Sequence, residues 1–291
     1  MKTCHSEYGT LKSLWIKPAR HAFISQQALS DQWQPLHYLA EPDYPKALTE
    51  YQGFEQHLKA TGTDLACFPE DGSVQIDSIY CRDAAIATDY GMIICNMGKG
   101  GRINEPAAQQ AAYEQANIAV LGTIEAPGTL EGGDVAWLDE RTLAVGHTYR
   151  TNDEGIAQLK QLLEPKGVEV IVAEMPHYKG PSDVFHLMSV LSPVDKDLAV
   201  VYSPLMPIRF RQLLLERGFD LVEVPDEEFE SMGCNVLATA PRKCLMVAGN
   251  PITQARMQAA GCEVTTYEGQ EISVKGGGGP TCLTRPLYRE I

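Results

Sequence analysis

The cysteine nearest the C-terminus, Cys282, follows four consecutive glycines, a proline and a threonine at positions 276–281. Glycine has no Cβ, so a run of glycines lets the backbone take a positive φ or approach another group closely. Cysteine is a good nucleophile near neutral pH once its thiol is deprotonated. This stretch therefore predicts a turn that presents a thiol for nucleophilic attack. A flexible tail that carries a buried cysteine is the alternative interpretation.

A histidine, several acidic groups and several arginines lie in short polar stretches of the remaining chain: Asp77, Arg82, Asp83, Arg102, Glu131, Arg150 and His186. Taken singly, each has an ordinary structural explanation, such as a turn, a buried core histidine or a surface ion pair of little energetic weight. Taken together, one nucleophile, one histidine, carboxylates and arginines predict a site for a small cationic substrate that also carries a carboxylate.

Short strands and single helices alternate along the chain and must position these residues. Hydrophobic periodicity predicts helices over residues 44–60, 105–116, 152–164, 207–217 and 252–260. It predicts strands, several of them in adjacent pairs, over residues 9–18, 64–69, 84–88, 91–96, 119–125, 142–146, 168–172, 198–203, 220–224, 236–239, 244–248 and 262–266. Residues 130–137 lead into a further strand, and residues 19–43 are expected to be irregular.

No linker or change of composition divides the chain. One supersecondary unit repeated without a boundary indicates units packed around a common centre, in a single domain over residues 1–291. A doubly wound parallel sheet is the competing architecture, but it predicts single strands between helices and a glycine-rich phosphate-binding turn. Residues 98–102 have neither that fingerprint nor the spacing of a P-loop.

The composition narrows the classes of partner and compartment. A formal net charge of -14 argues against a nucleic-acid-binding face, since phosphates are met by clustered Lys and Arg. The sequence shows no apolar signal region near its first residues and no uninterrupted apolar run of transmembrane length. Its eight cysteines are scattered, without a C-x-x-C pair. We therefore expect free thiols, a reducing compartment and a cytoplasmic location.

Six stretches, in order, carry a resemblance to a known family: PDYPKAL at 42–48, DSIYCRD at 77–83, EAPGTLEGGD at 125–134, YRTNDEG at 149–155, HL at 186–187 and GGGGPTC at 276–282. With these stretches the whole chain resembles the dimethylarginine dimethylaminohydrolase and amidinotransferase family of the guanidino-group-modifying superfamily. The resemblance implies an α/β (α+β) fold: a five-bladed, pseudo-symmetric propeller of ββαβ units (the pentein fold) in a single domain. The strand-strand-helix order fits that propeller independently.

The resemblance also implies roles for the residues that match the family's motifs. Cys282 falls on the nucleophile, His186 on the general acid and base, and Glu131 on the acidic residue that orients the histidine. Further residues match substrate contacts, with carboxylates that meet the guanidinium and arginines that hold the substrate's carboxylate: Asp83, Asp77, Arg102 and Arg150. A bidentate arginine fork suits a carboxylate.

The chemistry that follows from these roles is hydrolysis of a guanidinium C–N bond. A Cys282 thiolate would attack the guanidinium carbon, and His186 would protonate the departing nitrogen, which leaves an S-alkylthiouronium intermediate. Water activated by the same histidine would then release a citrulline-like product, with ammonia or an alkylamine as the first product. This chemistry needs no metal or organic cofactor. We expect a small-molecule guanidino substrate and no nucleic-acid or membrane partner, and leave a homodimer open.

Two positions depart from the family patterns and keep the substrate open. Arginine deiminases and amidinotransferases usually carry His-x-Asp, but Met188 stands two residues after His186 here. Dimethylarginine hydrolases commonly have Glu-Asp where this chain has Arg82-Asp83, which is closer to deiminases and dihydrolases. Arginine, methylated arginine and other substituted guanidines therefore remain candidate substrates. The alternative functions are amidino transfer to an amine, a non-catalytic binding protein on the same propeller and, less favoured, a papain-like protease.

Overall fold

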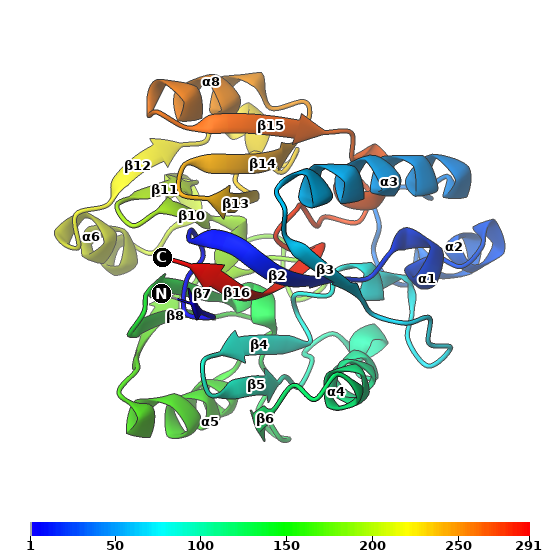
Figure 1. The fold of residues 1–291 in the computed structure, drawn as a ribbon, viewed down its shortest axis with the longest axis horizontal. Helices are drawn as coiled ribbons and strands as arrows, with labels where there is room; N and C mark the ends of the chain where they lie inside the picture. The colour runs from blue at the N-terminus through cyan, green and yellow to red at the C-terminus, as the bar shows by residue number, and fades with distance from the viewer. Residues whose placement is uncertain (1) are drawn as a thin grey trace.

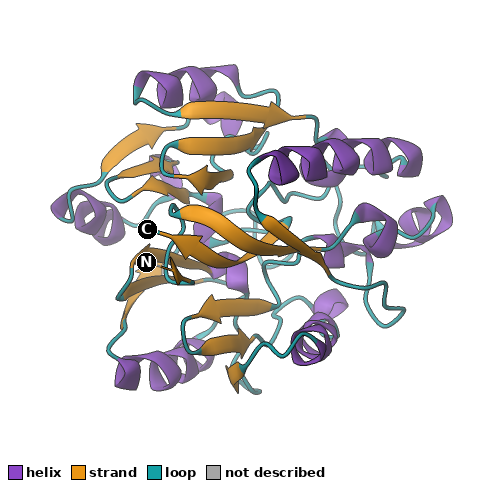
Figure 2. Cartoon of the chain, in the orientation of Figure 1, coloured by secondary structure: helices purple, strands orange, loops and turns teal. Residues whose placement is uncertain are grey.

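The computed structural model describes residues 2–291, and within this range the strands form five small sheets around a common centre (Figures 1 and 2). In each sheet two antiparallel strands are followed by a helix and a third strand that runs parallel to the second. We call each such ββαβ unit a blade. The five-bladed propeller expected from the resemblance is confirmed.

Four blades are continuous in sequence. Their elements are β4 (Ala85–Thr88), β5 (Gly91–Ile94), α4 (Glu105–Gln115) and β6 (Val120–Thr123); β7 (Val135–Asp139), β8 (Thr142–His147), α5 (Asp153–Leu163) and β9 (Glu169–Glu174); β10 (Leu191–Asp195), β11 (Leu198–Val201), α6 (Ile208–Glu216) and β12 (Asp220–Glu223); β13 (Val236–Ala240), β14 (Lys243–Val247), α8 (Pro251–Ala259) and β15 (Glu263–Tyr267). A short helix, α7 (Asp226–Phe229), lies between the last two.

The remaining blade joins the two ends of the chain. Its first strand is β16 (Thr284–Glu290), which pairs antiparallel with β2 (Thr10–Ile16), and its helix α3 (Tyr44–Ala60) leads to β3 (Asp64–Cys67). The two-residue strand β1 (Lys2–Thr3) adds to the free edge of β16, so the two termini lie side by side (Figure 1). This pairing fixes β16 in the ring, although it is the last strand of the chain.

Local signals explain where the helices begin. The side chain of Asp43 accepts a hydrogen bond from the backbone N–H of Lys46, and Pro45 lies in the first turn of α3. Asn152 caps α5 in the same way, with Oδ1 2.9 Å from the backbone nitrogen of Gly155. The expected helix over residues 44–60 is confirmed to the residue, and the expected cap at Asn152 is confirmed as well.

The first strands of the blades form the inner part of the molecule. All residues of the first strand β4 are buried, and the apolar side chains of β7, β10 and β13 pack into the core clusters. Strands buried on both faces read as continuous apolar runs, because the blade's helix covers the outer side. Burial of each such side chain contributes roughly 1.5–3 kcal/mol to the free energy of unfolding, which makes this centre a rigid support for loops.

Some expectations for individual elements were wrong. Residues 19–43 are not irregular throughout, because they contain α1 (Ala19–Ala22) and α2 (Gln26–Gln32). The signal was a helix cap: Ser25 Oγ accepts a hydrogen bond from the backbone nitrogen of Ala28 at 3.1 Å. The sequence analysis also missed β10 and β16. Both are first strands of blades, and β16 finds its partner only at the far end of the chain.

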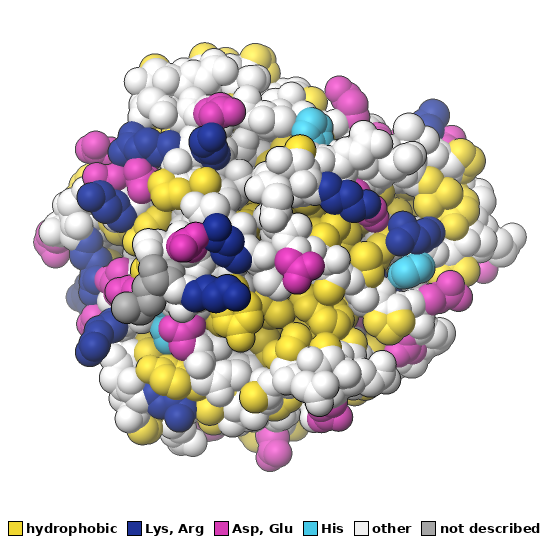
Figure 3. All heavy atoms as spheres, in the orientation of Figure 1, with side chains coloured by type: hydrophobic (Ala, Val, Ile, Leu, Met, Phe, Trp, Pro, Cys, Tyr) yellow, Lys and Arg dark blue, Asp and Glu magenta, His cyan; other side chains and the backbone are white. Residues whose placement is uncertain are grey.

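The surface carries charges of both signs. On the face drawn in Figure 3, Lys and Arg side chains lie interspersed with Asp and Glu along the left side, rather than in a separate basic patch. Among the residues that the structure describes, no helix is long and apolar enough to cross a membrane.

Candidate active site

The residues expected to do chemistry lie at corresponding places in different blades. Asp83 precedes β4, Glu131 precedes β7, His186 precedes β10 and Cys282 precedes β16, each within five residues of the strand. These first strands contact one another around the centre, β4 with β16 and β7 with β10. Loops that enter the inner strands from the same end therefore converge, which explains how residues from four separate blades meet.

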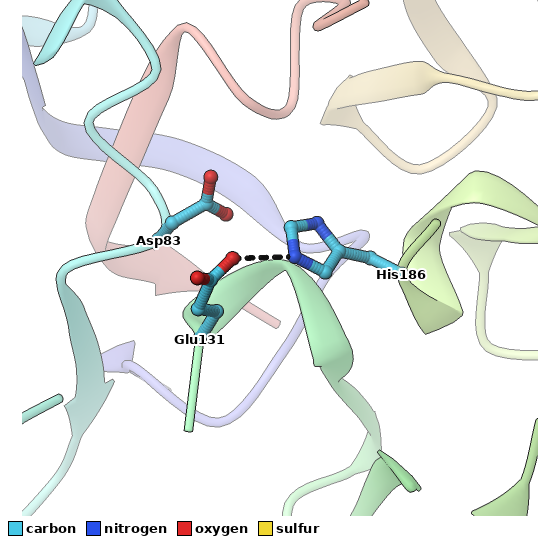
Figure 4. Close-up of side chains that lie close together, drawn as sticks. All are labelled: Asp83, Glu131 and His186. Carbon is cyan, nitrogen blue, oxygen red and sulfur yellow. Dashed lines mark hydrogen bonds and ion pairs between the residues drawn. The ribbon is translucent and has the colours of Figure 1, made fainter. Parts of the chain in front are cut away.

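Glu131 and His186 form a buried hydrogen-bonded pair. The Nε2 atom of His186 lies 2.8 Å from Oε2 of Glu131, and the two residues are 3% and 0% exposed. Asp83 completes a group in which one nitrogen or oxygen atom from each of the three side chains lies within 4.8 Å of the other two. Figure 4 shows the three side chains converging from separate loops.

Gly133 makes the close approach of this group possible. A Cβ built on Gly133 would overlap Nδ1 of His186 and would lie 2.7 Å from Oδ1 of Asp83. Any side chain at this position would therefore push the histidine or the aspartate away. The glycines of the Glu-Gly-Gly-Asp stretch give the site its backbone wall.

The charges around His186 favour its imidazolium form. Burial by itself would lower the pKa of His186, but Asp134, Asp83 and Glu131 together raise it to about 9. Burial would likewise raise the pKa of Glu131, but the hydrogen bond and charge of His186, with Arg150 and Arg102, lower it. The pair is therefore an imidazolium and a carboxylate at neutral pH, and His186 can act as a general acid.

Asp134 holds the loop that carries His186. Its Oδ1 accepts a hydrogen bond from the backbone nitrogen of Leu187 at 3.0 Å, and its Oδ2 accepts from the hydroxyls of Thr148 and Thr151 at 2.7 and 2.6 Å. Burial raises the pKa of Asp134 to about 6. The sequence analysis noted the Glu-Gly-Gly-Asp stretch but gave Asp134 no role.

Cys282 is held by side chains that the sequence did not suggest. Its Sγ accepts a hydrogen bond from Nδ2 of Asn235 at 3.3 Å, and Oδ1 of Asn235 accepts from the backbone nitrogen and hydroxyl of Thr281 at 3.0 and 2.8 Å. Burial and the charge of Asp83 raise the pKa of Cys282. Without a bound cationic substrate, the cysteine is therefore a thiol at neutral pH. Asn235 precedes β13 and completes the set of one polar residue from each blade.

The glycine run before Cys282 packs against Tyr80. A Cβ on Gly276 or Gly278 would overlap the ring or hydroxyl of Tyr80, and one on Gly279 would lie 2.5 Å from Oδ1 of Asn235. Gly277 has a φ of 76°, in the left-handed region. The run is therefore an ordered turn, and the flexible-tail interpretation is wrong.

Cys282 and His186 line a cavity of about 280 Å³. Much of its remaining wall is apolar, from Tyr178, Phe185, Met188, Phe229, Met232 and Val274. A narrower recess joins Cys282 and His186 to Asp77, Asp83 and Lys99. A further cavity of about 250 Å³ shares His37 and Ser182 with the first and includes Lys99 and Arg150. The site thus has an apolar side and a cationic side.

Arg102 is engaged with protein groups. Its Nε and Nη2 bond the two carboxylate oxygens of Glu105 at 2.8 and 2.7 Å, its Nη1 bonds Oδ2 of Asp83 at 2.5 Å, and Nη2 also donates to the carbonyl of Tyr80 at 2.8 Å. The residue is 4% exposed. Arg102 therefore fixes Asp83 in the recess, and a role in holding a substrate carboxylate stays a prediction.

Arg150 lies at the cationic side, and Asp77 in the recess pairs with the lysine of that side. Nη1 of Arg150 is 3.6 Å from Oε1 of Glu131 and forms no hydrogen bond within residues 2–291, while Nη2 donates to the carbonyl of Asp183 at 3.2 Å. Asp77 pairs with Nζ of Lys99 at 2.5 Å. Lys99 also donates its backbone N–H to Oε1 of Glu131 at 3.0 Å. The sequence analysis considered the glycines around Lys99 only as a phosphate loop and missed this residue.

Asp83, Glu131 and His186 are close enough together to serve as ligands of a metal ion. A metal-bound histidine must be neutral, however, and the pKa of His186 is raised to about 9 with Nε2 bonded to Glu131. The arrangement suits an imidazolium with carboxylates on either side better than a metal centre.

Comparisons with known proteins identify the family. A sequence model described as N,N dimethylarginine dimethylhydrolase, eukaryotic, matches residues 18–289. The chain is 26% identical over 247 residues to the N(G),N(G)-dimethylarginine dimethylaminohydrolase of Pseudomonas aeruginosa, covering 85% of this chain and 91% of the relative. It is 29% identical over 252 residues to the protein of that name from Streptomyces coelicolor, covering 84% and 89%.

The fold agrees with a solved structure. The mutant Pseudomonas aeruginosa enzyme complexed with citrulline superposes with a TM-score of 0.77 at 24% identity, covering 96% of this chain and 99% of that chain. The likeness shows a common fold, and the family model covers nearly the whole chain. The chain therefore belongs to the N,N-dimethylarginine dimethylhydrolase family, whose members are hydrolases that cleave the C–N bond of a guanidino group.

Proposed function

We propose that the protein hydrolyses the guanidinium C–N bond of arginine or of an N-methylated arginine through a covalent intermediate on Cys282. The observation that carries the proposal is the Oδ1 atom of Asp83, which is buried and has no hydrogen-bond partner in residues 2–291. It belongs to the recess that contains Cys282 and His186. A buried carboxylate oxygen of this kind needs a donor, and the N–H edge of a guanidinium supplies a cationic one.

The first half of the reaction uses the charges already in place. A bound guanidinium favours the Cys282 thiolate, whose proton leaves to water because His186 is already protonated. The thiolate forms a bond to the guanidinium carbon and gives a neutral tetrahedral adduct. His186 donates its proton to the departing nitrogen, the C–N bond breaks, and ammonia or an alkylamine leaves behind a thiouronium cation.

The second half returns the enzyme to its starting form. His186, now neutral, accepts a proton from a water molecule as the oxygen attacks the thiouronium carbon. The hydroxyl proton of the adduct leaves to water, the C–S bond breaks with its electron pair on the sulfur as a thiolate, and the neutral ureido product forms. The thiolate takes up a proton from water as the product departs, which restores the Cys282 thiol. Glu131 stabilises the imidazolium that results, since its carboxylate lies 2.8 Å from Nε2.

The apolar wall of the larger cavity favours a methylated substrate. Met188 and Phe185 border the space beside Cys282 and His186. A methyl group on the departing nitrogen gains from burial against these side chains, at about 0.8 kcal/mol per buried carbon. A second carboxylate two residues after His186 would instead demand an unsubstituted nitrogen, and the chain has Met188 there. We therefore infer that methylated arginine is preferred over arginine.

The cationic side suits the carboxylate of the amino-acid end. Nη1 of Arg150 is buried and makes no hydrogen bond within residues 2–291, although it lies 3.6 Å from Oε1 of Glu131. Arg150 borders the second cavity together with Lys99. We infer that these two residues, with Arg150 as the one expected from the motif, meet the carboxylate. Arg102 acts through Asp83.

A substrate panel tests the proposal. The purified protein is incubated with arginine, monomethylarginine, asymmetric dimethylarginine, agmatine and guanidino acids, and ureido product is measured. We expect product from at least one arginine and a loss of about a thousandfold or more in Cys282→Ala and His186→Ala. Substantial activity in either variant would overturn the mechanism. A new guanidine formed on addition of ornithine or glycine would identify amidino transfer instead.

The binding-protein alternative is tested by the thiol itself. A haloacetamidine resembles the guanidinium and should label Cys282 in preference to the other seven thiols, because only Cys282 faces Asp83 in the recess. Equal labelling of the exposed Cys67 or the half-buried Cys4 would favour a protein that does not act on guanidines.

A further inference from the structure

Arg82 lies beside the nucleophile, although the reaction described above does not use it. Its backbone N–H donates to the carbonyl of Cys282 at 3.2 Å, so the two residues are neighbours across the centre of the propeller. Arg82 borders the larger cavity together with Cys282, His186 and Gly133. It is only 2% exposed, which means that its charge acts in an environment from which water is largely excluded.

Glu7 fixes the guanidinium of Arg82. The Nη2 atom of Arg82 donates to Oε1 of Glu7 at 2.6 Å and to the carbonyl of Val135 at 3.2 Å. The same Glu7 oxygen also accepts the backbone N–H of Trp137 at 3.3 Å. Glu7 comes from the segment before β2, so the N-terminal part of the chain anchors a side chain at the active site.

The cation is only partly balanced. The Nε atom of Arg82 is buried and has no hydrogen-bond partner among residues 2–291. Two further buried arginines belong to β16, and within residues 2–291 their side chains donate hydrogen bonds to backbone carbonyls. Arg285 donates to the carbonyl of Arg82, and Arg289 donates to those of Gly9 and Ala238. Glu7 is the one carboxylate that pairs with Arg82 in the described part of the chain. Positive charge is therefore concentrated around Arg82, whose backbone N–H is hydrogen-bonded to the carbonyl of Cys282.

We infer that Arg82, fixed by Glu7, is a positioning residue that stabilises the Cys282 thiolate. The thiolate forms when the substrate binds and again when the C–S bond breaks, and in the second step the departing product is neutral. A fixed cation keeps the thiolate in place after the substrate's own charge has gone. The inference rests on the proposed function only in taking Cys282 as the nucleophile. It also gives a role to the arginine that stands where the related hydrolases commonly have glutamate.

Several other groups affect the ionisation of the Cys282 thiol. Asp83 opposes the thiolate, Arg82 favours it, and the imidazolium of His186 shares the cavity. The phenols of Tyr80 and Tyr267 also interact with the thiol, and burial raises the pKa of both far above neutrality, so neither titrates in the range of the experiment. The hydrogen bonds from Asn235 and Thr281 favour the thiolate in every variant considered below.

The test measures the thiol directly, without substrate. The alkylation rate of Cys282 by iodoacetamide is followed against pH by mass spectrometry of its peptide, with Cys282→Ala as the blank. Arg82→Met should move the inflection of this rate–pH curve to higher pH by roughly one unit or more, since the substitution removes a positive charge that favours the thiolate. Arg82→Lys should keep it near the wild-type position. Glu7→Gln should move it to lower pH, because the cation is then unopposed.

The double variant Arg82→Met/Glu7→Gln provides the matched control. It removes both charges and should give an inflection between those of the wild type and Arg82→Met. If Arg82 had only a structural role, the variants would change the midpoint of thermal unfolding, but the pH of the inflection would not rise in the order Glu7→Gln, wild type, double variant, Arg82→Met. An unchanged inflection in folded Arg82→Met would overturn the inference. If Arg82→Met does not fold, an inflection in Glu7→Gln that moves to higher pH or does not move would overturn the inference. If the wild type forms no ureido product but the alkylation curves show the expected inflections, the result would count against the proposed function alone.

Discussion

His186 and Glu131 come from different blades, and their side chains meet at 2.8 Å with almost no exposure to solvent. The pKa of His186 is raised to about 9 while that of Glu131 is lowered, so both partners are charged across the neutral range. In the proposed mechanism, the acid that protonates the leaving nitrogen therefore carries its proton before the substrate binds. This differs from a cysteine–histidine pair in which the histidine first takes the proton of the thiol.

The first prediction concerns Glu131→Gln. Loss of the carboxylate removes one of the groups that hold the proton on His186, so its pKa falls. We expect kcat to drop by about 10²- to 10⁴-fold and the alkaline limb of the pH–rate profile to move to lower pH. Steady-state kinetics between pH 6 and pH 10 measure both. An unchanged alkaline limb would assign that limb to a group other than His186.

The same pair should contribute to stability in a defined pH window. A pKa of His186 that is higher in the folded state gives stability that is full below 6.5 and lost as pH rises through about 9. A lowered pKa of Glu131 gives stability that is full above 4.5 and lost as pH falls. The difference in free energy of unfolding between the wild type and Glu131→Gln should therefore peak between about pH 4.5 and 6.5. Denaturant titrations at several pH values measure this difference. A difference in the free energy of unfolding that does not vary with pH would contradict the ion pair.

Met188→Asp tests whether the apolar wall beside His186 makes the site prefer a methylated substrate. A carboxylate on the wall beside His186 would bond an unsubstituted guanidinium nitrogen and leave a methylated one with an unpaired buried charge. We expect the ratio of kcat/KM for asymmetric dimethylarginine over arginine to fall by tenfold or more. Met188→Leu, which keeps the wall apolar, is the control and should leave the ratio near the wild-type value. A fall in both variants would show a packing effect only.

The sequence predicted the architecture well because its signals were local. The helix over residues 44–60 and the cap at Asn152 follow from short-range patterns that the structure reproduces. The last strand, β16, has no such signal, since its partner β2 lies at the other end of the chain. Pairings of this kind are decided by the closure of the ring and not by nearby residues.

The site residues that lie in recognisable sequence motifs could be predicted. Those that only the folded structure brings to the site could not. Asp83, Glu131 and His186 were named from their stretches, and the structure brings them within 4.8 Å. Asn235 and Lys99 were not named, because an asparagine before a strand and a lysine among glycines have no distinctive spacing. Arg102 matched a motif, yet its partners Glu105 and Asp83 could be identified only from the fold.

Arg150→Met tests the cationic side. The substrate carboxylate would lose a charged donor, so KM for arginine or methylarginine should rise by ten- to a hundredfold, with a smaller effect on kcat. Agmatine has no carboxylate, and its kcat/KM should change little. Lys12→Met, at an exposed ion pair with Glu290, is the control for loss of a positive charge. Equal losses for arginine and agmatine would mean that Arg150 acts through Glu131, which lies 3.6 Å away.

Gly278 links the glycine run through Tyr80 to the recess that contains Asp83 and Cys282. A Cβ at Gly278 would overlap the Tyr80 ring, and the carbonyl of Tyr80 accepts a hydrogen bond from Nη2 of Arg102 at 2.8 Å. Arg102 in turn holds Asp83. We therefore expect Gly278→Val to lower kcat/KM at least tenfold, with a smaller loss of thermal stability, because it displaces a wall of the site rather than the core.

A double-mutant cycle separates this route from a general strain of the turn. Tyr80→Ala makes room for the added side chain, so the activity cost of Gly278→Val should be smaller in the Tyr80→Ala background than in the wild type. Gly72→Ala, in an exposed turn, is the control and should change neither activity nor stability. Additive costs for Gly278→Val and Tyr80→Ala would rule out the Tyr80 route. Unfolding of Gly278→Val alone would show instead that the run is needed for the fold.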